Sequence, residues 1–213
     1  MRLPRSYKEV LDAGYMPGQY FRIVTGNLER LTGCLVTAPH GGGIEPGTSE
    51  ITRAIANVHG RAFYLFEGMR VKGNRQLHID STGFDEPTFV ELTAHCDLVL
   101  SVHGESGKER MIYVGGLDEN GKARMIDYLN AVLAAEGIMA VDATRHTRGN
   151  RIAGVSPQNL TNQGRRRQGV QLEFSEAARR AFFPDLDSRE GREHPGPYLL
   201  LLAGSVERAI AQL

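Results

Sequence analysis

The chain has 213 residues, a length that predicts a single domain over residues 1–213. Hydrophobic residues make up 41% of it and charged residues 23%, which excludes a disordered protein, and no apolar run approaches the ~20 residues of a membrane span. The 25 basic and 25 acidic residues cancel, so the net charge indicates neither a nucleic acid nor a membrane as partner. Because residues 1–8 lack the apolar stretch of a signal peptide, we expect a protein made in the cytoplasm.

Eight short apolar runs predict β-strands, each bounded by Gly, Pro or Asp and many containing β-branched residues. Several of the runs are apolar at consecutive positions, which indicates a sheet that is buried on both faces. In chain order the predicted strands are residues 21–25, 34–38, 61–66, 76–80, 98–102, 111–114, 138–142 and 170–174.

Four helices are predicted between or after these strands. Thr48 is the expected N-cap of the first helix and Asp85 of the second, while Gly137 ends the third. The fourth covers residues 199–213, and the polar stretch 184–197 before it is expected to be a surface loop. Strands that alternate with helices predict an α/β domain with a mixed, mostly parallel central sheet flanked by helices.

Three of the predicted strands end in side chains that can bind a metal ion or move a proton. His40 follows the second strand and is separated from Glu45 by a glycine-rich loop, while His103 and Glu173 end two later strands. The three consecutive glycines after His40 predict a tight loop, since they cannot form a stable helix interior. If these strands run parallel, the four side chains converge at one edge of the sheet, where α/β proteins bind their ligands.

Two imidazoles and a carboxylate are the ligand set of catalytic zinc sites, so we predict one zinc ion bound by His40, Glu45 and His103. Zinc lowers the pKa of a water molecule that it binds to near 7, and Glu173 could then act as the general base of an amide hydrolysis. Each residue alone also fits a structural role at a strand end or turn, and only their combination favours the metal site. His78 could support a zinc ligand, although a hydrogen-bonded core histidine fits its context as well.

A basic segment leads directly into Glu173. Residues 143–172 contain six arginines and neither Asp nor Glu. Arginine favours bidentate contacts to carboxylate or phosphate, and the absence of interleaved aromatic residues disfavours a platform for single-stranded nucleic acid. A solvated basic loop remains the structural alternative. We predict that an acidic substrate is bound beside the zinc ion by Arg145, Arg148, Arg151, Arg165, Arg166 and Arg167.

Four stretches carry a resemblance to a known family: APHGGGIEPGTSEI, LHIDSTGFDEP, LVLSVHGESG and GVQLEFS. In this order they resemble the poly-γ-glutamate hydrolase family of bacteria and their phages, from about Ser6 to the C-terminal helix. The resemblance implies a hydrolase-like fold related to zinc carboxypeptidases, zinc dependence, and cleavage of the γ-amide linkages of poly-γ-glutamate. It also implies His40, Glu45 and His103 as zinc ligands and Glu173 as the base. A phage enzyme of this kind would meet its polymer outside the cell after lysis.

Other functions stay open at this point. A zinc amidohydrolase or carboxypeptidase acting on small acyl-amino acids or peptides would use the same residues. A polyanion-binding module without catalysis would need only the arginines, and RNA binding is the weakest alternative. The chain lacks the Gly-x-Ser-x-Gly elbow of serine hydrolases and the Gly-Lys-Ser/Thr of phosphate loops, which disfavours both of those classes.

Overall fold

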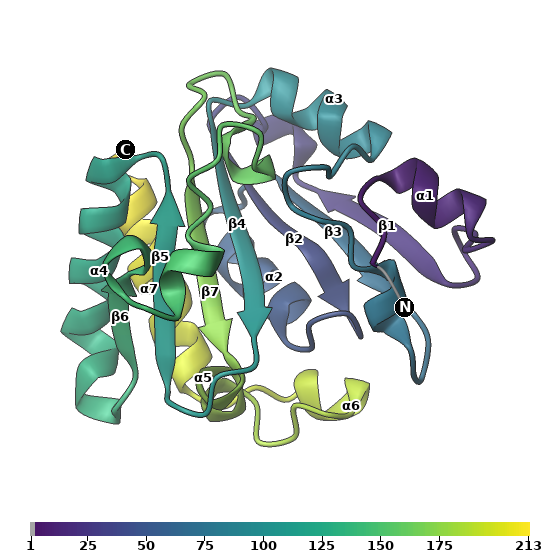
Figure 1. The fold of residues 1–213 in the computed structure, drawn as a ribbon. Coiled ribbons are helices and arrows are strands. Elements are labelled where there is room, and N and C mark those ends of the chain that lie inside the picture. Colours follow the sequence, from purple (N-terminus) through teal and green to yellow (C-terminus); the bar gives the residue numbers. More distant parts are fainter. Residues whose placement is uncertain (1–2) are drawn as a thin grey trace.

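A computed structural model describes residues 3–213, which are built around one seven-stranded sheet (Figure 1). The strand order across the sheet is β1-β3-β2-β4-β7-β5-β6. The strands are β1 (Phe21–Gly26), β2 (Cys34–Gly42), β3 (Phe63–Gly68), β4 (Leu98–Glu105), β5 (Met111–Gly116), β6 (Met139–Asp142) and β7 (Val170–Ser175).

The sheet is mixed, as predicted. Its central strands β3, β2, β4 and β7 run parallel to one another, whereas β1 is antiparallel to β3 and β5 is antiparallel to β7. β6 pairs with β5 in parallel at the other edge. The carboxyl ends of β2, β4 and β7 therefore meet at the same end of the sheet, which is where ligands bind in α/β folds.

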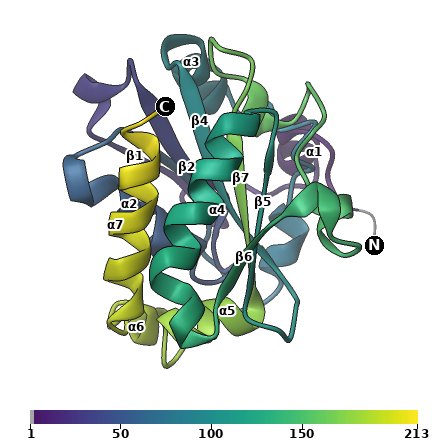
Figure 2. The ribbon, with the colours of Figure 1, turned by 90° about the vertical axis from the view of Figure 1, so that its left-hand side faces the viewer.

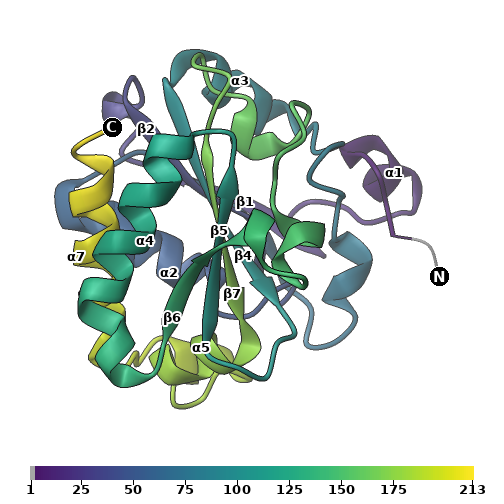
Figure 3. The same cartoon turned by 60° about the vertical axis from the view of Figure 1, so that its left-hand side comes forward.

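Helices cover both faces of this sheet. α2, α4 and α7 pack together on one face, and Figure 2 shows α4 and α7 side by side there. The connection from β6 to β7 lies on the other face, opposite α4 and α7 (Figure 3). The helices are α1 (Tyr7–Asp12), α2 (Thr48–His59), α3 (Pro87–His95), α4 (Glu119–Leu133), α5 (Glu176–Phe182), α6 (Arg189–Arg192) and α7 (Tyr198–Ile210). None of these helices is long and apolar enough to cross a lipid bilayer.

Successive strand residues fill two separate cores. Val36 and Leu100 belong to the core under α2, α4 and α7, whereas their neighbours Leu35 and Val99 belong to the core on the opposite face with Phe89 of α3. Because side chains alternate between the faces of a strand, burial on both faces makes consecutive positions apolar. The consecutive apolar positions in the sequence are thus explained by a sheet that is buried on both faces, as predicted.

One predicted strand is wrong. Residues 76–80 form the end of a 3₁₀ helix (Asn74–Leu77) and a loop, not a strand. Leu77 and Ile79 are both fully buried, which produced the alternating pattern, but they pack into the core without pairing with any strand.

Smaller differences concern helix ends and short helices. The N-cap of α2 is Gly47, in a left-handed conformation, and that of α3 is Glu86, whose side chain accepts from the Phe89 N–H. The predicted cap Asp85 instead accepts a hydrogen bond from the Tyr7 N–H at the start of α1. Neither α1 nor α5 was predicted, because helices this short carry little periodicity.

A buried ion pair attaches α7 to the rest of the domain. Glu207 is fully buried, and its two carboxylate oxygens accept from Arg61 Nε at 2.7 and 2.8 Å. We expect Glu207→Ala to lower the free energy of unfolding by about 3 kcal/mol, since it leaves the arginine charge without its partner. Urea denaturation measures this, with the exposed neighbour Arg208→Gln as control at less than about 0.5 kcal/mol. Equal losses in the two variants would contradict the expectation.

Candidate functional site

A glycine-rich loop carries the chain from β2 to Glu45. The pairing of β2 with β3 shifts register between Ala38 and Gly41, which breaks the regular strand just at His40. Gly42 has a φ of +63°, and a Cβ on Gly43 would lie 2.2 Å from the side-chain nitrogen of Asn74. Larger residues would therefore be strained or would clash here, which explains the glycines. The predicted loop is shorter than expected, however, because β2 continues through His40, Gly41 and Gly42 and the turn begins only at Gly43.

The loop folds Glu45 back onto His40. The backbone N–H of Glu45 donates to the His40 carbonyl at 2.9 Å, and the Glu45 carboxylate then lies 3.1 Å from His40 Nδ1. Its second oxygen accepts from the Gly104 N–H at 2.8 Å, directly after His103 on β4. Glu45 thereby links the ends of β2 and β4.

Four side chains converge at this point. His103 Nδ1 lies 3.2 Å from His40 Nδ1 and 3.9 Å from Glu45 Oε2. His78 joins them, with its Nε2 atom 3.1 Å from Glu45 Oε1 and its ring stacked on His40 at 3.7 Å between centroids. The structure thus brings His40, Glu45 and His103 together as the sequence predicted, and it adds His78.

The donor atoms suit a zinc ion. Ligands about 2.0–2.1 Å from a tetrahedral ion lie about 3.3 Å apart, close to the 3.1 and 3.2 Å that separate His40 Nδ1 from Glu45 Oε1 and His103 Nδ1. His40 Nε2 lies 2.7 Å from the Ile79 carbonyl and donates its proton there, so Nδ1 is the nitrogen that faces Glu45 and would bind a cation. The ligand atoms of His40, Glu45 and His78 also lie within 4.8 Å of one another. The buried His103 Nε2 and His78 Nδ1 atoms have no hydrogen-bond partner among residues 3–213.

The charges of the cluster alone favour the ligand states of Glu45 and His103 but not that of His40. Burial raises the pKa of Glu45, but the charge of His40 and hydrogen bonds from His40 and His78 outweigh it and hold that pKa well below its usual range. Burial and the His40 charge lower the pKa of His103 to about 3. Glu45 is therefore anionic and His103 neutral at pH 7, as zinc ligands are. Burial lowers the pKa of His40, but the charge of Glu45 and its hydrogen bond outweigh burial and raise that pKa. A cation bound at His40 would therefore displace a proton.

Glu173 lies beside this cluster. On β7 it is in register with His103 on the neighbouring β4, so the two backbones are about 4.8 Å apart and the side chains share a face. Its Oε1 atom accepts from Gln171 Nε2 at 2.9 Å, and the same amide donates to the Ile152 carbonyl. Burial, followed by the charges of Glu45 and Glu105, raises the pKa of Glu173 well above its usual range. A raised pKa is typical of a carboxyl group that accepts a proton and passes it on during catalysis.

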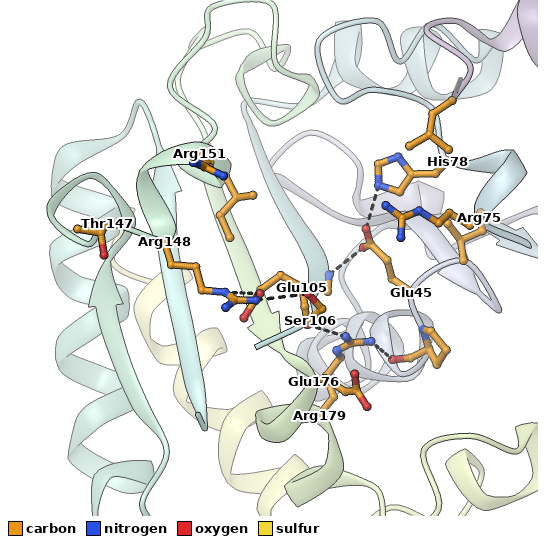
Figure 4. A pocket seen from close by; sticks show the side chains of 15 residues that line it. Glu45, Arg75, His78, Glu105, Ser106, Thr147, Arg148, Arg151, Glu176 and Arg179 are labelled. Carbon is orange, nitrogen blue, oxygen red and sulfur yellow. Dashed lines mark hydrogen bonds and ion pairs between the residues drawn. The ribbon is translucent and has the colours of Figure 1, made fainter. Parts of the chain in front are cut away.

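A cavity of about 970 Å³ opens beside the cluster and is large enough for several residues of an extended substrate. Glu45 and His78 line it, whereas the buried His40, His103 and Glu173 do not. Figure 4 shows Glu45, His78 and Arg75 on one side of it and Arg148 and Arg151 on the other.

Only two of the six predicted substrate-binding arginines lie at the cavity. They are Arg148, whose Nε donates to Glu105 Oε2 at 2.8 Å, and Arg151, whose side chain also lines the cavity. Arg145 is paired with Asp142 at 3.5 Å and does not line the cavity.

The other three, Arg165, Arg166 and Arg167, lie at the opposite end of the sheet. The backbone N–H groups of Arg165 and Arg166 donate to the carbonyls of Cys96 and Asp97, just before β4 begins. Arg165 is also paired with Asp97 at 2.7 Å. Since these arginines precede the start of β7 and Glu173 lies near its end, nearness in sequence does not bring them to the site.

Arg179 is a site residue that the sequence analysis missed. It is 5% exposed and donates to the Pro46 carbonyl at 2.6 Å and to the Glu105 carbonyl at 2.9 Å. Its guanidinium covers Gly104, where a Cβ atom would lie 2.7 Å from Arg179 Cζ. Arg179 thus joins the loop that carries Glu45 to the end of β4. One arginine on a seven-residue helix gives no pattern from which this role could be inferred.

The chain is similar to one described family and to several curated proteins. Residues 5–197 match the family described as poly-gamma-glutamate hydrolase. The SPbeta prophage-derived protein YoqZ of Bacillus subtilis (strain 168) is 36% identical over 163 residues, or 76% of this chain and 56% of YoqZ. YndL of the same strain is 37% identical over 149 residues, or 70% of this chain and 56% of YndL. The chain therefore spans little more than half the length of these curated relatives.

Two solved structures share the fold. A bacteriophage poly-gamma-glutamate hydrolase aligns with a TM-score of 0.85 and 31% identity, over 96% of this chain and 95% of that one. A zinc-free apo form of YndL aligns with a TM-score of 0.84 and 30% identity, over 97% of this chain and 96% of that one. These matches confirm both the predicted α/β fold and the resemblance found in the sequence.

Proposed function

The chain belongs to the poly-γ-glutamate hydrolase family, and from this premise we propose that it is a zinc-dependent hydrolase of γ-glutamyl amide bonds in poly-γ-glutamate. The observation that carries the proposal is the convergence of His40, Glu45 and His103 at distances suited to zinc, with Glu173 beside them. The similarity to a phage poly-gamma-glutamate hydrolase supports the substrate, and the zinc-free form of YndL supports the metal.

We assign His40, Glu45 and His103 as ligands of one zinc ion per chain, with His78 as a hydrogen-bond partner of Glu45. His40 and His103 are 1% and 2% exposed, whereas the His78 side chain is 29% exposed and contacts a Glu45 oxygen that is already 3.1 Å from His40. Three ligands leave one position of a tetrahedral ion open, which a catalytic site requires.

The proposed mechanism divides the chemistry between the metal and Glu173. When bound, zinc supplies a Lewis acid that polarises the amide carbonyl and lowers the pKa of water. Glu173 takes the proton from the attacking water and delivers it to the leaving nitrogen. The hydrogen bond from Gln171 holds the Glu173 carboxylate in place for both transfers.

The lengths of poly-γ-glutamate chains after incubation with the protein test this proposal. Parallel samples with a chelator, and with zinc added back after the chelator, are compared. We expect shortening that stops with the chelator and returns with zinc. Polymer of unchanged length in every sample, with protein folded by circular dichroism, would contradict the proposal.

Arg179→Met should weaken zinc binding and catalysis, because the loop that carries Glu45 loses its bond to the end of β4. Loss of such an outer contact lowers metal affinity about 10–100-fold in other proteins, and we expect an effect of that size. Competition with a chromophoric chelator measures it. Arg179→Lys should recover part of the affinity.

Arg180→Met is the matched control, since Arg180 is exposed and paired with Glu176 and Asp187 away from the loop. Its zinc affinity should equal that of the wild type. An Arg179→Met protein that binds zinc as tightly as this control would show that the contact has no such role.

A further inference from the structure

Arg75 is a cavity residue to which neither the sequence nor the proposed mechanism assigns a role. It lies on the 3₁₀ helix Asn74–Leu77, on the side of the cavity formed by Glu45 and His78 (Figure 4). Its side chain is exposed and makes no hydrogen bond or ion pair with any residue between 3 and 213. A guanidinium without a partner at the wall of a cavity is available to a ligand.

The backbone of Arg75 is nevertheless firmly placed. The buried Asn74 side chain donates to the Arg70 carbonyl at 2.6 Å and accepts from the Arg70 N–H at 2.9 Å. This amide fills the space left by Gly43 and Gly68, where Cβ atoms would lie 2.2 and 2.8 Å from it. The segment that carries Arg75 is therefore packed on the same loop that positions Glu45.

Arg151 has the corresponding place on the opposite wall. It lies on the 3₁₀ helix Gly149–Ile152, is exposed, and likewise has no side-chain partner in the part of the chain that the structure describes. The Ile152 carbonyl accepts from Gln171 at 2.7 Å, and Gln171 also holds Glu173. Arg75 is thus connected to the metal side of the site, and Arg151 to the base.

The cavity acids do not neutralise these two arginines. Glu105 is paired with Arg148, Glu176 with Arg180, and Glu45 faces the histidines and the Gly104 N–H. Within residues 3–213, two guanidinium groups of the cavity, those of Arg75 and Arg151, therefore remain unpaired, one on each wall. Guanidinium binds carboxylate through two parallel hydrogen bonds, which gives both affinity and orientation.

We infer that Arg75 and Arg151 bind two different free carboxylates of the substrate, one on each side of the bond that is cleaved. The inference rests on the proposed function, because poly-γ-glutamate carries one free carboxylate on every residue. Arg75 and Arg151 thereby determine that a substrate needs a charged group on both sides of the scissile amide.

A set of three substrates tests this assignment. The first is a γ-linked glutamate tetramer, and the other two carry a carboxamide in place of the free carboxylate on the acyl side or on the amine side of the central bond. Steady-state kinetics are measured for the wild type, Arg75→Gln, Arg151→Gln, and Arg208→Gln as the control, an exposed arginine of α7 outside the cavity.

Each cavity variant should raise KM for the tetramer about 10–100-fold, the effect of losing one charge-assisted hydrogen-bonded pair, with kcat less affected. Arg75→Gln should leave KM nearly unchanged for one of the two carboxamide substrates, the one that lacks the carboxylate bound by Arg75, and should raise KM about 10–100-fold for the other. Arg151→Gln should show the same pattern with the two carboxamide substrates exchanged. Arg75→Lys should recover part of the loss, and Arg208→Gln should match the wild type.

The inference is overturned if the same carboxamide substrate abolishes the KM effect of both variants. It is also overturned if neither variant differs in KM from Arg208→Gln while the wild type cleaves the polymer. A wild type that cleaves neither polymer nor tetramer overturns the proposed function, and this inference with it. Cleavage of the polymer by the wild type thus separates the two failures.

Discussion

Replacing Glu173 with glutamine is expected to lower kcat for poly-γ-glutamate cleavage by about 10²–10⁴-fold, the usual contribution of a positioned proton-transfer group. Glutamine has nearly the same shape but cannot accept the proton of the attacking water. Glu173 makes no hydrogen bond within the His40–Glu45–His103 cluster, and its carboxylate accepts from the Gln171 amide. Zinc content and KM should therefore stay close to the wild-type values.

The measurement is steady-state cleavage of a defined γ-linked oligomer, together with metal analysis of the same preparations. Glu176→Gln is the matched control, because Glu176 is a carboxylate at the cavity beside the site, on the first residue of α5, and is paired with the exposed Arg180. We expect it to keep nearly full activity. A Glu173→Gln protein with more than a tenth of wild-type kcat would exclude Glu173 as the base. Binding of the polymer without turnover in the wild type would instead favour a polyanion-binding module.

The parts of the site at strand ends were predictable from the sequence. His103 and Glu173 each end an apolar run, and parallel neighbours in one sheet bring such ends together whatever the connections between them. The same reasoning located His40, because the glycines after it indicate where β2 stops being a regular strand.

The parts of the site on irregular segments were not predictable in this way. His78 reaches Glu45 from a 3₁₀ turn and loop whose buried Leu77 and Ile79 imitate a strand. Arg151 lies at the cavity while Arg165 lies at the far end of the sheet, only because the β6–β7 connection crosses the face of the sheet before entering β7 at its amino end. The path of an irregular connection cannot be predicted from hydrophobic periodicity. Both arginines were therefore predicted to bind substrate from the charge composition of residues 143–172 alone.

The division of roles between His103 and His78 leads to the second large expected effect, which is loss of the metal. His103→Ala should fail to retain zinc through dialysis, because it removes one of the three proposed ligands. His40 and Glu45 then remain as the only two proposed ligands of the ion. His78→Ala should keep stoichiometric zinc with affinity reduced about 10–100-fold, as expected for a residue that hydrogen-bonds a ligand. Metal analysis after dialysis and chelator competition measure the two cases.

The opposite result is equally informative, since the ligand atoms of His40, Glu45 and His78 also lie within 4.8 Å of one another. Zinc lost from His78→Ala but retained by His103→Ala would make His78 the third ligand in place of His103. Because His103 lies on β4 and His78 on the loop after the 3₁₀ helix Asn74–Leu77, the two ligand sets attach the metal to different parts of the fold. The pair of histidine variants distinguishes the two sets before any substrate is added.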